Sequence, residues 1–282
     1  MKTFFSFFCL CMAVFFTSLQ AQMTTPAPSP FSKLEQKVGL TDVTIEYSRP
    51  SAKGRVVFGQ LVPFGEVWRA GANSVTKVTF SNDVKIGGTD LKTGSYALLI
   101  TPNKESWQIH FFPYDKSNWT SYVGESAPAA AAVMTAKTMA LPFSVETWTM
   151  GIGNLSNNGA QLNFIWESTY AGVEFTVPTE TAVMASIEKT MAGPGASDYS
   201  AAATYYLSEG KDLNQALAWI NTSLEKGGDR YWLLRTKALI QAGLGDKAGA
   251  IETAKKSTQL AQEAGNNEYV RMNTNSIGEW MQ

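Results

Sequence analysis

The sequence predicts an α+β protein in two parts: an antiparallel β-sandwich or barrel-like domain over residues 31–178, followed by a small helical domain over residues 179–282. Two observations predict this division. Between residues 43 and 177 apolar residues recur at every second position, the spacing of strands with one buried face. Beyond residue 179 they recur at helical spacing. The length of 282 residues also favours two domains.

The composition excludes several classes of protein. Hydrophobic residues make up 44% of the chain and charged residues 17%, which is too apolar for a disordered protein. The 23 basic and 24 acidic residues nearly cancel, so the chain lacks the positive field that nucleic-acid binding requires. We therefore expect no nucleic-acid partner.

Residues 1–21 are typical of a secretory signal peptide, with Lys2, then an apolar run over residues 4–19, then Ala21 before the expected cut. The run is shorter than the ~20 residues of a membrane span. We expect an exported protein, periplasmic or secreted, without a transmembrane segment after cleavage. Residues 22–30 are rich in proline and are expected to form an extended tether.

The β domain is predicted from alternation over four stretches, at residues 77–81, 107–111, 161–166 and 173–177. Their apolar members include Trp107 and Trp166, and these rings are expected in the core with Trp148. Turn-forming residues are expected to connect strands at residues 87–88, 92–94, 102–103 and 157–159. The alanine-rich stretch 126–136 is compatible with a loop or a short helix.

The helical region contains an internal resemblance. Residues 210–219 resemble residues 242–251, with Ala216 matched to Ala248, at a period close to the ~34 residues of a tetratricopeptide unit. This similarity predicts a degenerate tetratricopeptide-like tail that binds a protein partner; the alternative is an ordinary α-hairpin extension. Three aspartates are expected to cap helices at their N-termini: Asp212, Asp229 and Asp246.

A dense motif lies between residues 47 and 96. It contains Ser48-Arg49-Pro50, Gly54-Arg55, Phe58-Gly59, Leu61-Val62-Pro63-Phe64-Gly65, Trp68-Arg69, Gly71-Ala72-Asn73, and then Gly88, Leu91, Gly94 and Tyr96. Over about residues 30–178 the chain resembles the secreted bacterial proteins grouped as domain of unknown function 2911. It departs from their pattern at Phe64, Ala70 and Ser74. The resemblance implies a β fold and export, and it brings no activity with it.

Six residues of this motif form the candidate ligand site: Arg49, Arg55, Glu66, Trp68, Arg69 and Asn73. Arginine presents a fixed fork to carboxylates, phosphates or sugar hydroxyls, and tryptophan presents a flat apolar face to a ring. Held on loops over a β scaffold, these types could bind a small polar ligand such as a sugar or an anion. The alternative is an internal network in which Arg49 or Arg69 pairs with Glu66 and fixes the segment.

Catalytic chemistry has few candidates. His110 is the only histidine, and both cysteines lie within the predicted signal peptide, so no metal site and no cofactor are expected. Glu66 is the alternative acid or base, and His110 the alternative general base.

The leading hypothesis is an exported, non-enzymatic binding or envelope-associated protein, whose β domain binds a small polar ligand or glycan and whose tail binds a protein. The alternatives are a carbohydrate-active hydrolase that uses Glu66 and a purely structural envelope component.

Overall fold

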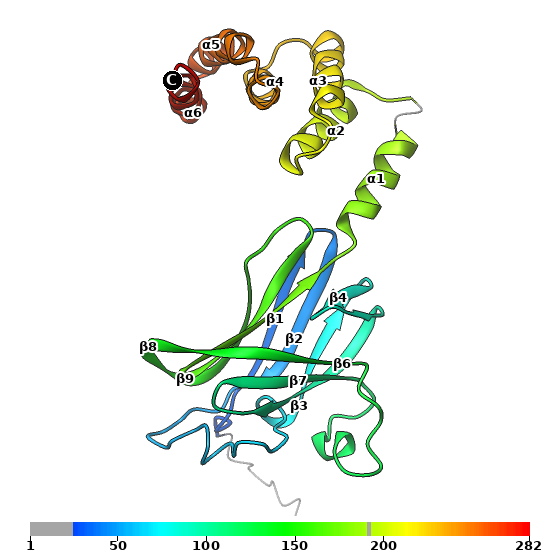
Figure 1. Cartoon of the computed structure of the whole chain (residues 1–282), viewed down its shortest axis with the longest axis vertical. Helices are drawn as coiled ribbons and strands as arrows, with labels where there is room; N and C mark the ends of the chain where they lie inside the picture. Colours follow the sequence, from blue (N-terminus) through cyan, green and yellow to red (C-terminus); the bar gives the residue numbers. More distant parts are fainter. Residues whose placement is uncertain (1–24, 191–192) are drawn as a thin grey trace, which may run out of the picture.

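The computed structural model describes residues 25–190 and 193–282 (Figure 1). The predicted signal peptide, residues 1–21, lies outside the described residues, together with both cysteines. The described chain contains a β-rich part followed by helices, which confirms the α+β class.

The β-rich part is one continuous antiparallel sheet of nine strands in the order β1-β2-β3-β6-β7-β8-β9-β4-β5. The strands are β1 (Phe31–Val38), β2 (Thr41–Ser48), β3 (Ala72–Phe80), β4 (Val84–Ile86), β5 (Thr89–Leu91), β6 (Gly94–Pro102), β7 (Ser106–Pro113), β8 (Ala132–Gly153) and β9 (Gly159–Thr176). The 3₁₀ helix η1 (Trp119–Tyr122) lies between β7 and β8.

The long strands β8 and β9 wrap the sheet around its core. Residues 132–137 of β8 pair with β7, whereas residues from Thr138 onward pair with β9. The register between β8 and β9 shifts on either side of Val145, and such irregularities bend a strand. Figure 1 shows β8 and β9 crossing over the other strands. One face of this bent sheet lines the main core, whereas residues of the other face pack with Tyr122 of η1 in a second buried cluster.

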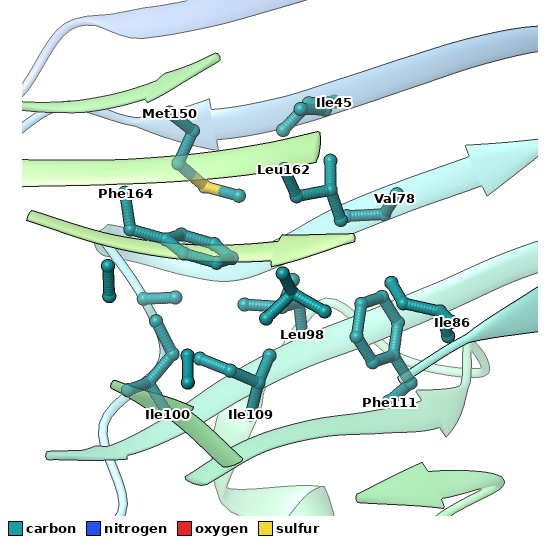
Figure 2. Packing of buried hydrophobic residues seen from close by; sticks show 14 of the residues in the cluster. Ile45, Val78, Ile86, Leu98, Ile100, Ile109, Phe111, Met150, Leu162 and Phe164 are labelled. Atoms are coloured by element: carbon teal, nitrogen blue, oxygen red, sulfur yellow. The ribbon is translucent and has the colours of Figure 1, made fainter. Parts of the chain in front are cut away.

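The core lies inside this curved sheet. Side chains from several strands, among them Ile45, Val78, Leu98 and Phe164, meet in one shared interior (Figure 2). Trp107, Trp148 and Trp166 are each no more than 1% exposed, so the three tryptophans expected in the core are found there.

The four turns expected from the sequence are found as connections between strands. The alanine-rich stretch, however, is neither a loop nor a helix throughout, because residues 132–136 begin β8. Ala132, Met134 and Ala136 are buried while Val133 and Thr135 are exposed. Alternation and pairing with β7 therefore override the helical preference of alanine.

The tail contains six helices: α1 (Thr179–Thr190), α2 (Ala196–Ser208), α3 (Leu213–Gly227), α4 (Tyr231–Gly243), α5 (Lys247–Glu263) and α6 (Asn267–Trp280). In the described residues, no helix is both long and apolar enough to cross a membrane. The centre of the helix packing between α2, α3 and α4 consists of Ala203, Ala216, Ile220 and Ile240. Small residues there let the helices approach closely.

The helix pair α4–α5 repeats the pair α2–α3 at an offset of 34 residues, rather than at the 32 that the alignment of Ala216 with Ala248 implied. Ser223 in α3 and Ser257 in α5 are both buried, and each donates a hydrogen bond to the first carbonyl of a preceding helix, at 2.8 and 2.6 Å. The acceptors belong to Ala196 and Tyr231. The equivalent of Ala216 is consequently Ala250, and both are fully buried.

Two of the three predicted caps are confirmed. The carboxylate of Asp212 accepts from the backbone N–H groups of Asn214 and Gln215, and that of Asp246 accepts from Gly249. The prediction for Asp229 was wrong, because α4 is preceded by Arg230 without a side-chain cap. Asp229 forms an ion pair with Lys256 instead.

Replacing Asp246 by alanine should lower the free energy of unfolding of the tail by about 1 kcal/mol, the usual effect of losing an N-cap. The Asp246→Asn variant is the matched control, since its amide oxygen still accepts from Gly249. Urea unfolding followed by circular dichroism at 222 nm measures both. Equal stability of the Asp246→Ala variant and the unchanged chain would contradict the assigned cap.

Polar contacts join the sheet domain to the tail. Glu209, just beyond α2, accepts hydrogen bonds from the side-chain amides of Asn157 and Asn158 at 2.6 and 2.7 Å. Within the tail, Lys211 forms an ion pair with Glu180 in α1. The turn between β8 and β9 thus contacts the turn between α2 and α3.

Candidate functional site

Residues 49–71 connect β2 to β3 by a long irregular path, and we call them the capping segment. Near its start the carbonyl of Pro50 accepts from the N–H of Trp148 in β8, at 2.9 Å. Near its end Trp68 and Ile100 of β6 exchange two backbone hydrogen bonds, both 2.8 Å. The segment is therefore anchored on β8 at one side and on β6 at the other, and it crosses one end of the sheet (Figure 1).

The capping segment and the residues beside it hold several unfavourable backbone conformations. Lys53, Ala70 and Asn73 have φ values of +51°, +55° and +60°, in the left-handed region that residues other than glycine seldom adopt. Ala70 is fully buried, and its carbonyl accepts a hydrogen bond from the hydroxyl of Thr76 at 2.8 Å. Strain of this kind persists where surrounding contacts impose it, and it clusters at functional sites.

A cavity of about 440 Å³ lies between the capping segment, the residues before β1 and the sheet. Its walls come mostly from the capping segment. The lining residues are Pro28, Ser29, Pro50, Ser51, Lys53, Arg55, Leu61, Val62, Trp68, Arg69, Gly71, Ala72 and Trp166.

Two stacked indoles form an apolar wall of this cavity. Trp68 is half-buried and packs on Trp166 with ring centroids 5.7 Å apart and planes 23° apart. Trp148 meets the Trp68 ring edge-on at 4.7 Å. The indole N–H of Trp68 donates to the carbonyl of Gly71 at 3.1 Å, which fixes the ring. Trp68 is thus held rigidly between the core and the cavity, as an aromatic platform requires.

Three of the six predicted ligand residues line the cavity: Arg55, Trp68 and Arg69. The Nε and Nη2 groups of Arg55 donate to the carbonyls of Ala52 and Ser51, at 2.9 and 2.8 Å. The Arg69 guanidinium lies 5.6 Å from the centre of the Trp119 ring. Its buried Nε has no hydrogen-bond partner within the described residues.

Arg49 and Asn73 do not line the cavity; they hold its surroundings in place. Arg49 donates from Nε to the Trp148 carbonyl at 3.0 Å and from Nη2 to the Thr149 hydroxyl at 2.7 Å. The Asn73 amide donates to the carbonyl of Ser29 and the hydroxyl of Ser48, at 3.3 and 3.2 Å. Since Ser29 belongs to the lining, Asn73 is a positioning residue for the cavity wall.

Glu66 is exposed and lies outside the cavity lining, and no ion pair joins it to an arginine in the part of the chain that the structure describes. His110, on β7, also lies outside the lining. Its Nε2 is 3.2 Å from the hydroxyl of Thr101, and its ring stacks on Phe112 at 6.2 Å. Burial lowers the pKa of His110 from its ordinary value and so favours the neutral ring.

Sequence reasoning missed Lys53, Ser51, Ser29 and Trp166 as lining residues. Lys53 and Ser51 lie within the capping segment, and the density of its motif was the available signal. Ser29 falls within the expected tether, and Trp166 within the expected core. Trp166 is in fact both, because it is 1% exposed and yet borders the cavity.

Among residues 25–190 and 193–282, no three histidine, cysteine, aspartate or glutamate side chains are grouped so that they could hold a metal ion.

The geometry defines a curved antiparallel sheet with a helical tail. The capping segment closes one end of the sheet around a basic and aromatic cavity.

The family is shown by comparison with family models. Residues 29–177 match the family described as "Protein of unknown function (DUF2911)", and the chain belongs to that family. The match covers the sheet domain and ends before α1. Comparison with curated proteins and with solved structures found no significant match.

Proposed function

We propose that this is an exported, non-enzymatic binding protein of the cell envelope, which holds a small polar ligand in the cavity beneath the capping segment. The observation that carries the proposal is the rigid Trp68 platform beside Arg55 and Arg69. A concave site with an apolar wall and a few convergent polar groups is the usual form of a ligand pocket. The apolar run over residues 4–19 supports export.

The choice of binding over catalysis rests on the positions of the two catalytic candidates. Glu66 and His110 both lie outside the cavity lining. A general acid or base must come within about 3 Å of the proton that it transfers. A ligand held against Trp68 is therefore surrounded by cationic and hydroxyl groups rather than by a carboxylate or an imidazole.

A second proposal concerns the tail, which we interpret as two degenerate tetratricopeptide-like units. Its support is the 34-residue offset between the Asp212 and Asp246 caps and between the buried Ser223 and Ser257. Helical repeats of this kind present surfaces to protein partners. In this proposal the sheet domain binds the ligand and the tail binds the protein partner.

The Trp68→Ala variant tests the binding proposal. Purified mature protein is titrated calorimetrically with a panel of monosaccharides, sugar acids and sugar phosphates. The variant should bind any ligand of the cavity at least about tenfold more weakly, because it loses an aromatic contact and the apolar area beneath it.

The matched control is Trp232→Ala, which removes a tryptophan that is 44% exposed on α4 and distant in sequence from the capping segment. Its affinities should equal those of the unchanged protein. Thermal unfolding of both variants establishes that each is folded. Saturable binding that Trp68→Ala leaves intact would place the site elsewhere, and binding of no compound would favour a structural envelope component.

A further inference from the structure

Resting on the proposed binding function, we infer that the ligand is an oxyanion attached to a ring: a carboxylate or phosphate held by the cations of the cavity, with its ring lying against Trp68. The polar side chains of the lining are of two kinds only. Lys53, Arg55 and Arg69 carry positive charge, while Ser29 and Ser51 carry hydroxyls.

No lining residue is an aspartate, glutamate, asparagine or glutamine. A neutral sugar presents hydroxyl groups that both donate and accept, and amide or carboxylate oxygens would accept from them. Guanidinium and ammonium groups only donate. The charged groups of this cavity therefore match an acceptor-only ligand group, and carboxylate and phosphate are the acceptors for which arginine geometry is suited.

The cations are not neutralised by the protein itself. In the described residues no ion pair includes Lys53, Arg55 or Arg69. One carboxylate touches the rim, that of Glu146, and it accepts from the backbone N–H of Lys53 at 2.7 Å. Glu146 is exposed and outside the lining, so it leaves the three charges of the wall available.

Arg69 gives the strongest single indication of an anionic ligand. It is half-buried, and its Nε lacks a hydrogen-bond partner among the described residues. A buried donor without a partner is unfavourable, and removing that penalty favours a ligand that supplies an acceptor. Arg55 has two of its nitrogens bonded to backbone carbonyls, which holds the guanidinium in place and leaves Nη1 to donate.

Three probes of one ring size test the inference by calorimetry at low ionic strength: D-glucose, D-glucuronate and D-glucose 6-phosphate. At least one of the two anions should bind about tenfold or more tightly than glucose, since charge-assisted hydrogen bonds exceed neutral ones by about that factor. The better anion identifies carboxylate or phosphate as the natural group. Its affinity should also fall when salt is raised from 50 to 500 mM.

Arg69→Gln should weaken binding of that anion about tenfold or more, whereas Arg69→Lys, which keeps the charge, should recover part of the loss. Lys53→Gln provides a second variant at an exposed position where folding is not at risk. Lys255→Gln is the charge-matched control, because it removes one exposed cation from α5 and should leave the affinity unchanged.

The outcomes separate the two proposals. If glucose binds as tightly as either anion, without salt dependence, and Trp68→Ala weakens it, then the binding function stands and the oxyanion class is wrong. If an anion binds equally well to Arg69→Gln, Lys53→Gln and the unchanged protein, the assigned cations are wrong. If none of the three probes binds the folded protein, the oxyanion class is contradicted, and the binding function is contradicted as well only when no compound of the wider panel binds.

Discussion

Replacing Trp148 by alanine should lower the free energy of unfolding of the sheet domain by about 3–5 kcal/mol, the range for emptying a buried aromatic position. Trp148 is fully buried. Its ring meets Trp68 at 4.7 Å and stacks on Phe164 at 6.2 Å. Its loss therefore leaves a void between the core and the platform of the cavity, which neighbours in a close-packed interior cannot fill without strain. Urea unfolding followed by circular dichroism gives the value.

Two further variants make this measurement specific. Phe143→Ala removes a ring that is 59% exposed on β8 and should change stability by no more than about 0.5 kcal/mol. Trp148→Phe should lower the free energy of unfolding less than Trp148→Ala does, because phenylalanine retains a ring. It also removes an indole N–H that has no partner within the described residues. A Trp148→Ala variant as stable as Phe143→Ala would contradict the packing described for this end of the core.

The second large effect is expected at Gly39, in the turn between β1 and β2. Gly39 has a φ of +54°, and a Cβ atom there would overlap the carbonyl oxygen of Asn157 and the hydroxyl of Thr179. Alanine in the left-handed region is unfavourable by about 1–2 kcal/mol, and overpacking adds about 1–3 kcal/mol. Gly39→Ala should therefore lower the free energy of unfolding by about 2–5 kcal/mol, measured by the same urea titration.

Gly88→Ala is its matched control. Gly88 has a φ of +87°, and nothing lies within 4 Å of the position that a Cβ would take. The Gly88→Ala variant therefore has the unfavourable backbone conformation without the steric overlap. The difference between the two variants isolates the contact at which the β1–β2 turn, the β8–β9 turn and the start of α1 meet. Equal losses in Gly39→Ala and Gly88→Ala would mean that this contact is absent.

The four alternating stretches predicted from the sequence lie in β3, β7 and β9, and the four turns were also predictable, because alternation with period two reports directly which side of a strand is buried. Trp107 and Trp166 illustrate this, since each lies on the apolar side of an alternating stretch and each is buried. The bend of β8 was not predictable, because it depends on pairing with β7 along one half and with β9 along the other. The periodicity of a strand's own sequence does not indicate which strands it pairs with.

The helical tail shows the limit of local patterns. Asp212 and Asp246 were recognised as caps, because an N-cap is set by residues within one turn. Asp229 has the same residue type and a similar position relative to its helix, and yet it pairs with Lys256 across the packed helices. Trp232 on α4 is 44% exposed although it is large and apolar, whereas the small residues Ala203 and Ala216 lie at the centre of the helix packing.

The candidate site was predictable in part for a related reason. The motif identified the segment that closes the sheet, and Arg55, Trp68 and Arg69 of that segment line the cavity. The motif could not indicate that Arg49 lies beside Trp148, 99 residues away in the chain, where its Nε donates to the Trp148 carbonyl. Nor could it indicate that Trp166 borders the same cavity, since that placement follows from the fold of β9.

Binding of ligand against the Trp68 platform can be observed most directly in the indole N–H resonances of the eight tryptophans. The protein is labelled with ¹⁵N, its indole signals are assigned by single substitutions, and the tightest ligand of the panel is titrated. We predict that the Trp68 signal shifts most, followed by that of Trp166, while the signals of Trp219, Trp232 and Trp280 in the tail stay in place. Saturable binding with an unmoved Trp68 signal would mean that the ligand does not bind against Trp68.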